Sequence, residues 1–247
     1  MNYLILSDMH GNWDAFEAVL HNARRKRFDA ALVLGDLVGY GAAPNQVVEA
    51  VRQLALRVHA VRGNHDKVVS GVDTGSNFNH AALQAAQWTS LHLTPANLRF
   101  VRDLPRGPQR IDERLAICHG SPLDEDNYVF SDLDALEIFS AHETSVTFFG
   151  HTHIPSLFSL EGRRLTVQAL RGKRGTVFLH PAGRYLINPG SIGQPRDRDP
   201  RASYMTYDSD RRVVHWYRIA YPVQRAQARI RKAGLPELLA ERLAFGA

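Results

Sequence analysis

The sequence predicts an α/β protein with two layers of β-sheet, and three observations support this. Strand-like and helix-like segments alternate over the first hundred residues, short strand-like segments joined by turns follow residue 153, and no repeat or linker-like stretch interrupts the chain. The alternation predicts a parallel sheet with helical crossovers, and the later run predicts an antiparallel, hairpin-rich second sheet. At 247 residues the chain suits one large domain, so residues 1–247 are expected to form a single domain.

The first part of the chain supplies the alternating elements. Short apolar runs predict buried strands at 3–6, 30–34 and 58–61. Pro44 suits the first turn of a helix between the second and third strands. A helix is also expected between the first two strands, because apolar residues recur there at the spacing of one helical face, at Phe16, Val19, Leu20 and Ala23.

The remaining elements follow from the same two periodicities. Further strands are expected at 115–118, 146–149, 155–160, 165–170, 185–188, 203–207 and 213–219. Further helices are expected at 81–91, 95–104, 133–139, 223–232 and 236–243.

The composition excludes several classes of protein. No run approaches the roughly 18 apolar residues of a membrane span. The N-terminal segment lacks a basic start, so neither an anchor nor a signal peptide is expected. Cys118 is the single cysteine, which excludes an intrachain disulfide and any metal site built on several cysteines. A reducing, cytoplasmic location is therefore expected.

The formal net charge of +5 is unevenly distributed along the chain. Residues 163–232 hold 16 Lys and Arg against 4 Asp and Glu, whereas the rest of the chain holds 14 against 21. Net charge bears on association rather than on chemistry. The basic segment is therefore expected either to face an anionic partner or to form a solvated, arginine-rich surface.

Polar residues follow five of the predicted strands, at the point where each strand ends. Open α/β sheets bind their ligands outside the carboxyl ends of the strands, so these residues are expected to gather in one region. A single Asp or His at such a position is often only a helix cap or a surface residue, but five strand ends that each supply a ligand type point to function. The residues are Asp8, His10, Asp36, Asn64, His65, Asp66, His119, His151 and His153.

The chemistry of this set points to two metal ions. Carboxylate, imidazole and amide oxygen ligands together suit borderline divalent cations. We expect manganese first, with iron, zinc, nickel, cobalt or magnesium as alternatives. Two such cations about 3.5–4 Å apart need a bridging carboxylate and can activate a water for in-line displacement.

The polar blocks resemble those of the calcineurin-like metallophosphoesterase superfamily in order and in spacing. The blocks are Asp8-Met9-His10, Gly35-Asp36, Gly63-Asn64-His65-Asp66, His119-Gly120 and Gly150-His151-Thr152-His153. The rest of the chain, with its Asn188-Pro189-Gly190-Ser191 segment, resembles the small single-domain bacterial and archaeal members of phosphodiesterase type. The resemblance implies a four-layer α/β/β/α sandwich of two mixed sheets flanked by helices.

The resemblance also implies a role for each residue of the blocks. Asp36 would bridge the two metals, His65 would act as general acid, and Asp66 would orient His65 and support its cationic form. The first metal would be held by Asp8, His10 and His153. The second metal would be held by Asn64, His119 and His151.

The implied activity is hydrolysis of a small phosphodiester or nucleotide by a hydroxide that bridges the metals. A dinucleoside polyphosphate hydrolase, a serine/threonine phosphoprotein phosphatase and a nuclease are the alternative enzymes. The phosphoprotein phosphatases carry an arginine shortly after their second block, and the segment Gly35–Gly41 has none. A non-catalytic interaction module is the alternative from another class.

Three residues are candidates for substrate contacts: Asn12, Arg62 and Arg196. Arg62 is equally compatible with an ion pair at a strand edge, and Arg196 lies beside acidic Asp197 and Asp199, which makes local ion pairs the default. The expected partner is a small anionic phosphoester. No membrane partner is expected, nucleic acid is not favoured, and the oligomeric state is left open.

Overall fold

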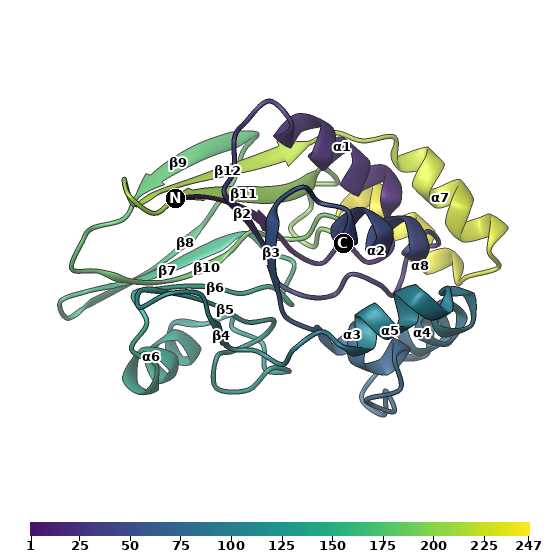
Figure 1. Ribbon diagram of the computed structural model, residues 1–247, viewed down its shortest axis with the longest axis horizontal. Coiled ribbons are helices and arrows are strands. Elements are labelled where there is room, and N and C mark those ends of the chain that lie inside the picture. Colours follow the sequence, from purple (N-terminus) through teal and green to yellow (C-terminus); the bar gives the residue numbers. More distant parts are fainter.

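Two six-stranded sheets form the centre of the computed structural model, which describes all 247 residues (Figure 1). One sheet has the order β3 (Arg57–Ala60), β2 (Ala30–Val33), β1 (Asn2–Leu6), β11 (Ala202–Asp208), β12 (Val213–Ile219) and β9 (Arg174–Phe178). The other has the order β4 (Gln109–Arg110), β5 (Leu115–Ile117), β6 (Val146–Phe148), β10 (Arg184–Asn188), β7 (Ser156–Glu161) and β8 (Arg164–Ala169).

Both sheets are mixed, which corrects part of the sequence-based expectation. β1, β2 and β3 are parallel, as are β5, β6 and β10. The strands after residue 153 do not form a separate antiparallel sheet. Instead β11, β12 and β9 extend the first sheet, and β7 and β8 extend the second beyond β10. Hydrophobic periodicity indicates which faces of a strand are buried but not which sheet the strand joins. The division of the later strands between the two sheets was therefore not predictable from it.

Side-chain alternation along the strands builds the layers. In β1, Tyr3 and Ile5 point into the core between the two sheets, and Leu4 and Leu6 point into the core beneath the helices. Successive side chains of a strand face opposite sides, so a strand buried on both faces reads as a continuous apolar run. This explains why the first strand appears in the sequence as an unbroken Tyr3–Leu6 segment.

Helices cover the outer faces of the two sheets. α1 (Trp13–Ala23) packs on β11 and β12, and α6 (Asp132–Ala141) packs on β7 and β8 on the opposite side. The arrangement is a four-layer α/β/β/α sandwich, so the expected fold class is confirmed (Figure 1). The other helices are α2 (Pro44–Arg52), α3 (Asn64–Val69), α4 (His80–His92), α5 (Pro95–Arg102), α7 (Val223–Lys232) and α8 (Glu237–Phe245).

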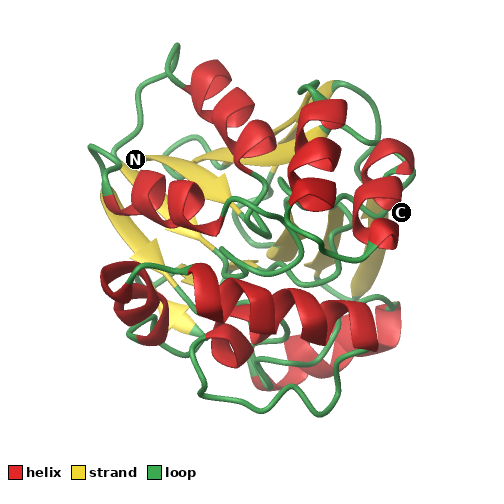
Figure 2. Cartoon of the chain, turned by 90° about the vertical axis from the view of Figure 1, so that its right-hand side faces the viewer, coloured by secondary structure: helices red, strands yellow, loops and turns green.

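Most helices lie on the right-hand side of Figure 1, which faces the viewer in Figure 2. None of the helices is long and apolar enough to cross a membrane. Three elements were not predicted from the sequence, each for a physical reason. α3 is only six residues long, β4 has two residues, and β9 is an edge strand with a half-buried alternation and a glycine under Trp216.

Ion pairs absorb part of the positive charge of residues 163–232. Arg225 and Arg229 of α7 both reach the buried carboxylate of Asp14 in α1, at 3.0 and 2.9 Å. Arg218 pairs with Asp197. Asp14 lies outside the segment and offsets part of its charge excess, whereas Asp197 belongs to the segment itself.

Candidate metal centre

The residues predicted from the strand ends do come together. Asp8 and His10 follow β1, Asp36 follows β2, and α3 begins at Asn64 after β3. In the other sheet, His119 follows β5, and His151 and His153 follow β6. Two buried groups of potential ligand atoms result, each with its atoms within 4.8 Å of one another: Asp8, His10, Asp36 and His153 in the first cluster, and Asp36, His119 and His151 in the second.

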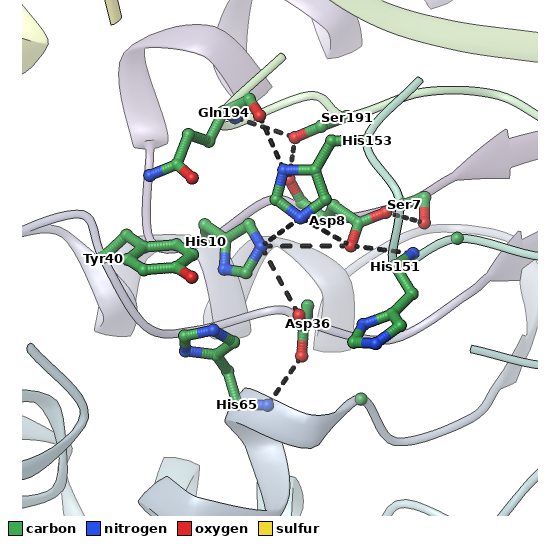
Figure 3. A network of polar contacts seen from close by, with 12 residues as sticks. Ser7, Asp8, His10, Asp36, Tyr40, His65, His151, His153, Ser191 and Gln194 are labelled. Atoms are coloured by element: carbon green, nitrogen blue, oxygen red, sulfur yellow. Dashed lines mark hydrogen bonds and ion pairs between the residues drawn. The ribbon is translucent and has the colours of Figure 1, made fainter. Parts of the chain in front are cut away.

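The first cluster is compact (Figure 3). The Nε2 atoms of His10 and His153 lie 3.1 Å apart, and His153 Nε2 lies 3.3 Å from Oδ1 of Asp8. His10 Nε2 lies 3.4 Å from Oδ2 of Asp36. These nitrogen and oxygen atoms face one point from three different loops.

Asp36 joins the two clusters through a single oxygen. Its Oδ2 lies 3.4 Å from His10 Nε2 in the first cluster and 3.4 Å from His119 Nε2 in the second. His119 Nε2 also lies 3.0 Å from the side-chain oxygen of Asn64. Oδ1 of Asp36 accepts the backbone N–H of His65 at 2.9 Å, which fixes the direction of the carboxylate.

Backbone carbonyls set the orientation of the four imidazole rings. Nδ1 of His10 faces the carbonyl of Val38 at 3.1 Å, and His119 and His153 are held in the same way by Leu34 and Gln194, at 2.8 and 2.6 Å. A proton on Nδ1 leaves the Nε2 lone pair free toward the cluster, as in metal sites. The ring of His151 is reversed.

His151 presents its other nitrogen. Its Nε2 lies 3.1 Å from the carbonyl of Asp126, so a proton on Nε2 leaves Nδ1 for the second cluster.

The chemistry of the donor atoms indicates whether cations suit the site. Two imidazole lone pairs that face each other at 3.1 Å, as in His10 and His153, lack an attractive partner unless a cation or a proton lies between them. The two buried clusters are consistent with a binuclear metal site.

The electrostatics of the clusters agree with this arrangement. Burial lowers the pKa of His151 to about 3, and it lowers the pKa values of His10 and His153 well below their usual range. These rings are therefore neutral near pH 7 and carry the lone pair that a metal requires. Burial also acts to lower the pKa of His119, but the charge and hydrogen bond of Asp36 outweigh it and raise that pKa to about 10. A proton on His119 would therefore compete with a cation for the same nitrogen.

The backbone is left-handed at most of the cluster residues. Positive φ is uncommon for residues other than glycine and marks local strain that the surrounding structure must offset. Five of the six acidic and histidine residues of the two clusters adopt it: Asp8 at 52°, His10 at 48°, Asp36 at 52°, His151 at 66° and His153 at 61°.

Two glycines make room for the functional side chains. A Cβ on Gly63 would lie 2.1 Å from Oδ1 of Asp36, and a Cβ on Gly39 would lie 2.4 Å from Nδ1 of His65. Gly39 also has a φ of +87°, which other residues rarely adopt. Gly63, which belongs to the sequence blocks, and Gly39, which lies outside them, are therefore positions of close approach.

His65 lies beside the clusters and points into a pocket. Its ring is only 3% exposed and packs against the rings of Tyr40, Phe78 and His10, at centroid distances of 4.3, 4.5 and 4.9 Å. Nδ1 of His65 has no hydrogen-bond partner. Burial lowers the pKa of His65 to about 4. The pocket is further lined by Asn64, Lys67, Asp126, Tyr128 and His151.

Asp66 differs from the sequence-based expectation. Its carboxylate does not contact the imidazole of His65. It accepts the backbone N–H groups of Leu37, Val38 and Gly63, at 3.0, 3.3 and 3.0 Å. Asp66 therefore ties the loop after β2 to the start of α3, and it makes no hydrogen bond or ion pair with the His65 ring through which it would orient that ring directly. The i+1 spacing placed the residue correctly but could not show where its side chain points.

Two of the three substrate candidates are already engaged. Oδ1 of Asn12 accepts the N–H of Ala15 and caps α1, while Nδ2 donates to the carbonyl of Gly193 and to Tyr221, at 2.8 and 3.3 Å. Asn12 is thus a structural cap, and its side chain is not free for a phosphoryl oxygen.

Arg62 is likewise bound within the protein. Its Nε and Nη2 atoms donate to the two oxygens of Glu125 at 3.1 and 2.8 Å. This is the ion pair that the sequence left open as an alternative. A guanidinium held in this way by a carboxylate is not free to grip a phosphate.

Arg196 has no carboxylate partner. Its Nη2 contacts the hydroxyl of Tyr40 at 3.3 Å and the side-chain oxygen of Gln194 at 3.1 Å, and its buried Nε has no partner. The neighbouring Arg201, by contrast, is paired with Asp199 at 2.6 Å. Local ion pairs therefore account for Arg201 but not for Arg196.

Several residues that support the site gave weak signals or none in the sequence. Ser7 donates to Oδ2 of Asp8, and Ser191 donates to the Asp8 carbonyl at 2.8 Å. Nδ2 of Asn188 bonds to the Gly150 carbonyl at 2.6 Å, so the Asn188–Ser191 segment joins the loops after β1 and β6. The carbonyls that orient the histidines carry no signal, because any residue provides one.

Comparison with known proteins identifies relatives over nearly the whole chain. The model of the calcineurin-like phosphoesterase superfamily domain matches residues 1–212. An uncharacterized protein of Methanocaldococcus jannaschii is 35% identical over 246 residues, which are 98% of this chain and 97% of that protein. The phosphodiesterase YfcE of Escherichia coli K12 is 27% identical over 218 residues, with coverage of 85% and 89%.

Solved structures agree with this result. A metallophosphoesterase from Sphaerobacter thermophilus has a TM-score of 0.86 and 38% identity, and the match covers 100% of this chain and 99% of that one. A hypothetical protein from Pyrococcus horikoshii OT3 has a TM-score of 0.83 at 20% identity, covering 100% and 98%, and so shares the fold.

Proposed function

The chain belongs to the calcineurin-like phosphoesterase superfamily, and on that premise we propose that it hydrolyses small phosphodiesters or nucleotides with two divalent cations. The name of the related E. coli phosphodiesterase supports a diester substrate. The observation that carries the proposal is the position of Asp36, whose Oδ2 lies 3.4 Å from a histidine nitrogen of each buried cluster. A single bridging oxygen between two clusters suits a pair of cations.

The proposed ligands follow from the geometry of the donors. Asp8, His10 and His153 would hold one cation, and Asn64, His119 and His151 the other, with Asp36 shared between them. When bound, such a pair of cations supplies Lewis-acid activation of water and of a phosphoryl oxygen. We take manganese as the first metal to test, because the set combines carboxylate, imidazole and amide oxygen.

His65 is proposed to donate a proton to the leaving oxygen. Burial lowers its pKa to about 4, so the ring is neutral near pH 7 and still carries one N–H. An anionic phosphoryl group in the pocket would raise that pKa, because a neighbouring negative charge favours the protonated form. Protonation of His65 would then accompany substrate binding.

Arg196 is proposed to bind a phosphoryl oxygen of the substrate. Its guanidinium lacks a carboxylate partner and contacts Tyr40, whose ring packs against both His10 and His65. Arginine suits this role, because its donors match the geometry of phosphate. Tyr40 would hold the guanidinium toward the clusters.

The metal requirement is tested with protein freed of metal by chelation. Hydrolysis of bis-p-nitrophenyl phosphate should be lost and should return with added Mn²⁺, Fe²⁺, Zn²⁺, Co²⁺, Ni²⁺ or Mg²⁺ to different extents. Asp36→Asn should reduce the number of cations bound. Full activity after exhaustive chelation would refute the proposal.

The roles of His65 and Arg196 are tested by paired variants. His65→Asn should lower kcat by about 100-fold or more, with the exposed His92→Asn as the matched control. Arg196→Ala should raise KM, whereas Arg201→Ala should not, because Arg201 already pairs with Asp199. A kcat of His65→Asn within threefold of wild type, or equal KM values for both arginine variants, would contradict the assigned roles.

A further inference from the structure

We infer that the segment Gly120–Phe130 is a positioning strap for the second cluster and that Tyr128 and Glu125 are its key residues. The inference rests on the proposed two-cation centre and goes beyond its ligands. The strap leads directly from His119, contacts His151, and is tied to the helix that begins at Asn64. It therefore adjoins His119, contacts His151, and is linked to Asn64 only through Lys67 of the same helix.

The first contact sets which nitrogen of His151 faces the cluster. The Asp126 carbonyl lies 3.1 Å from Nε2 and is the only hydrogen-bond partner of that ring. Without it, neither tautomer of His151 is preferred, and the ring is free to turn. The Asp126 carbonyl thus orients the ring of His151, as the Leu34 carbonyl orients the ring of His119.

The second contact holds the plane of the ring. Tyr128 stacks on His151 with centroids 3.9 Å apart and planes within 16°, and Phe130 stacks on Tyr128 at 5.2 Å and 15°. Tyr128 is 47% exposed and Phe130 56% exposed, so neither ring is placed there by burial in a core. The stacked rings therefore support the plane of the His151 ring, and His151 itself is buried.

Ion pairs anchor the strap to the rest of the site. Glu125 accepts both donors of Arg62 and lies 3.4 Å from Nζ of Lys67, and Lys67 also bonds to the carboxylate of Asp126 at 2.7 Å. Lys67 belongs to α3, one turn after Asn64. The side chains of Lys67 and Glu125 are only 7% and 9% exposed, so their pair is shielded from solvent more than an ordinary surface pair. Asp126 is 49% exposed and closes the group toward solvent.

The backbone of the strap is closed on itself. Gly120 donates to the carbonyl of Glu125 at 3.1 Å, and Ser121 donates to that of Asn127 at 2.9 Å. A Cβ on Gly120 would lie 2.6 Å from the Asn127 carbonyl, so the close turn requires glycine there. None of the strap's hydrogen bonds, ion pairs or ring contacts reaches His10 or His153 of the first cluster. The strap should therefore support one cation and not the other.

The test measures stepwise binding of Mn²⁺ to chelated protein by isothermal titration calorimetry. Tyr128→Leu and Glu125→Gln should each weaken one of the two binding steps by about 10–100-fold, and it should be the step that His151→Ala removes. The other step should stay within threefold of wild type. Tyr128→Phe keeps the stacked ring and should bind both cations normally. Glu237→Gln, which breaks the exposed Arg231–Glu237 pair, is the control for Glu125→Gln.

Thermal unfolding of each variant without metal shows that it is folded before titration. Unchanged binding in both Tyr128→Leu and Glu125→Gln would overturn the inference, as would equal weakening of both steps. A wild-type protein that binds a single cation would instead contradict the two-cation centre itself. The two failures are therefore distinguishable.

Discussion

Gly63→Ala is the substitution that most directly tests the placement of Asp36. Gly63 has a φ of −102° and a ψ of 175°, an extended conformation that alanine adopts without strain. The effect of the added methyl group is therefore steric. Its carbon would lie 2.1 Å from Oδ1 of Asp36, and ordinary contacts begin at 3.4 Å, so one group must move by about 1.3 Å, the difference of the two distances.

A shift of that size affects both clusters, because Asp36 serves both. It also stretches the hydrogen bond of 2.9 Å from the N–H of His65 to Oδ1 of Asp36. Misplacement by about 1 Å can cost 100-fold in rate, and an added methyl group in a packed site costs about 1–3 kcal/mol of stability. We therefore expect kcat for bis-p-nitrophenyl phosphate to fall by about 100-fold and both Mn²⁺ binding steps to weaken.

Gly162→Ala is the control. Gly162 has a φ of +62° and nothing within 4 Å of its added Cβ, so the substitution strains the backbone far from the clusters. It should cost about 1–2 kcal/mol of stability and leave kcat unchanged. If Gly63→Ala bound both cations and hydrolysed the diester within threefold of wild type, the argument from close approach would be refuted.

Three further predictions follow from the contacts and pKa values of single residues. Because Asn12 caps α1, Asn12→Ala should lower the free energy of unfolding by about 1 kcal/mol and Tm by about 2–4 °C without raising KM. Thermal unfolding and steady-state kinetics measure these effects. Cys118, fully buried and with its pKa raised by burial, should resist iodoacetamide in the native protein and react after unfolding, as read by mass spectrometry. The pKa of His119 is raised to about 10, so below that pH a cation must displace the proton of His119. The affinity of the second cluster for Mn²⁺ should therefore rise about tenfold per pH unit from pH 6 to 8. An affinity that does not change with pH would contradict the role of His119 as a ligand.

The ligand set was predictable because parallel strands bring their carboxyl ends to one edge. Short apolar runs located β1 and β2 in one sheet and β5 and β6 in the other, so the polar residues after them gather at one edge of each sheet. The packing of the two sheets against each other then brings these two edges together. The division of the later strands between the two sheets was not predictable. The apolar patterns of β11 and β7 show that each strand is buried, and only packing between distant segments decides which sheet each one joins.

Side-chain direction was the other limit of the sequence. Asp66 and Asn12 lie next to functional residues along the chain, yet their polar atoms bond to backbone groups of the fold. Arg62 and Arg196 look alike in the sequence, and only the position of Glu125 separates the paired guanidinium from the one without a carboxylate. Partners distant in sequence decide such roles, and a single sequence does not record them.

The left-handed backbone at the cluster residues has a consequence for protein engineering. Strain of this kind costs about 1 kcal/mol or more at each residue, and glycine or asparagine would relieve part of it. A screen that selects only for heat resistance in metal-free protein would therefore favour changes at Asp8, His10, Asp36, His151 and His153. The selected variants would be more stable proteins that have lost the ability to bind cations. Stability screens of this chain should therefore be run with metal present.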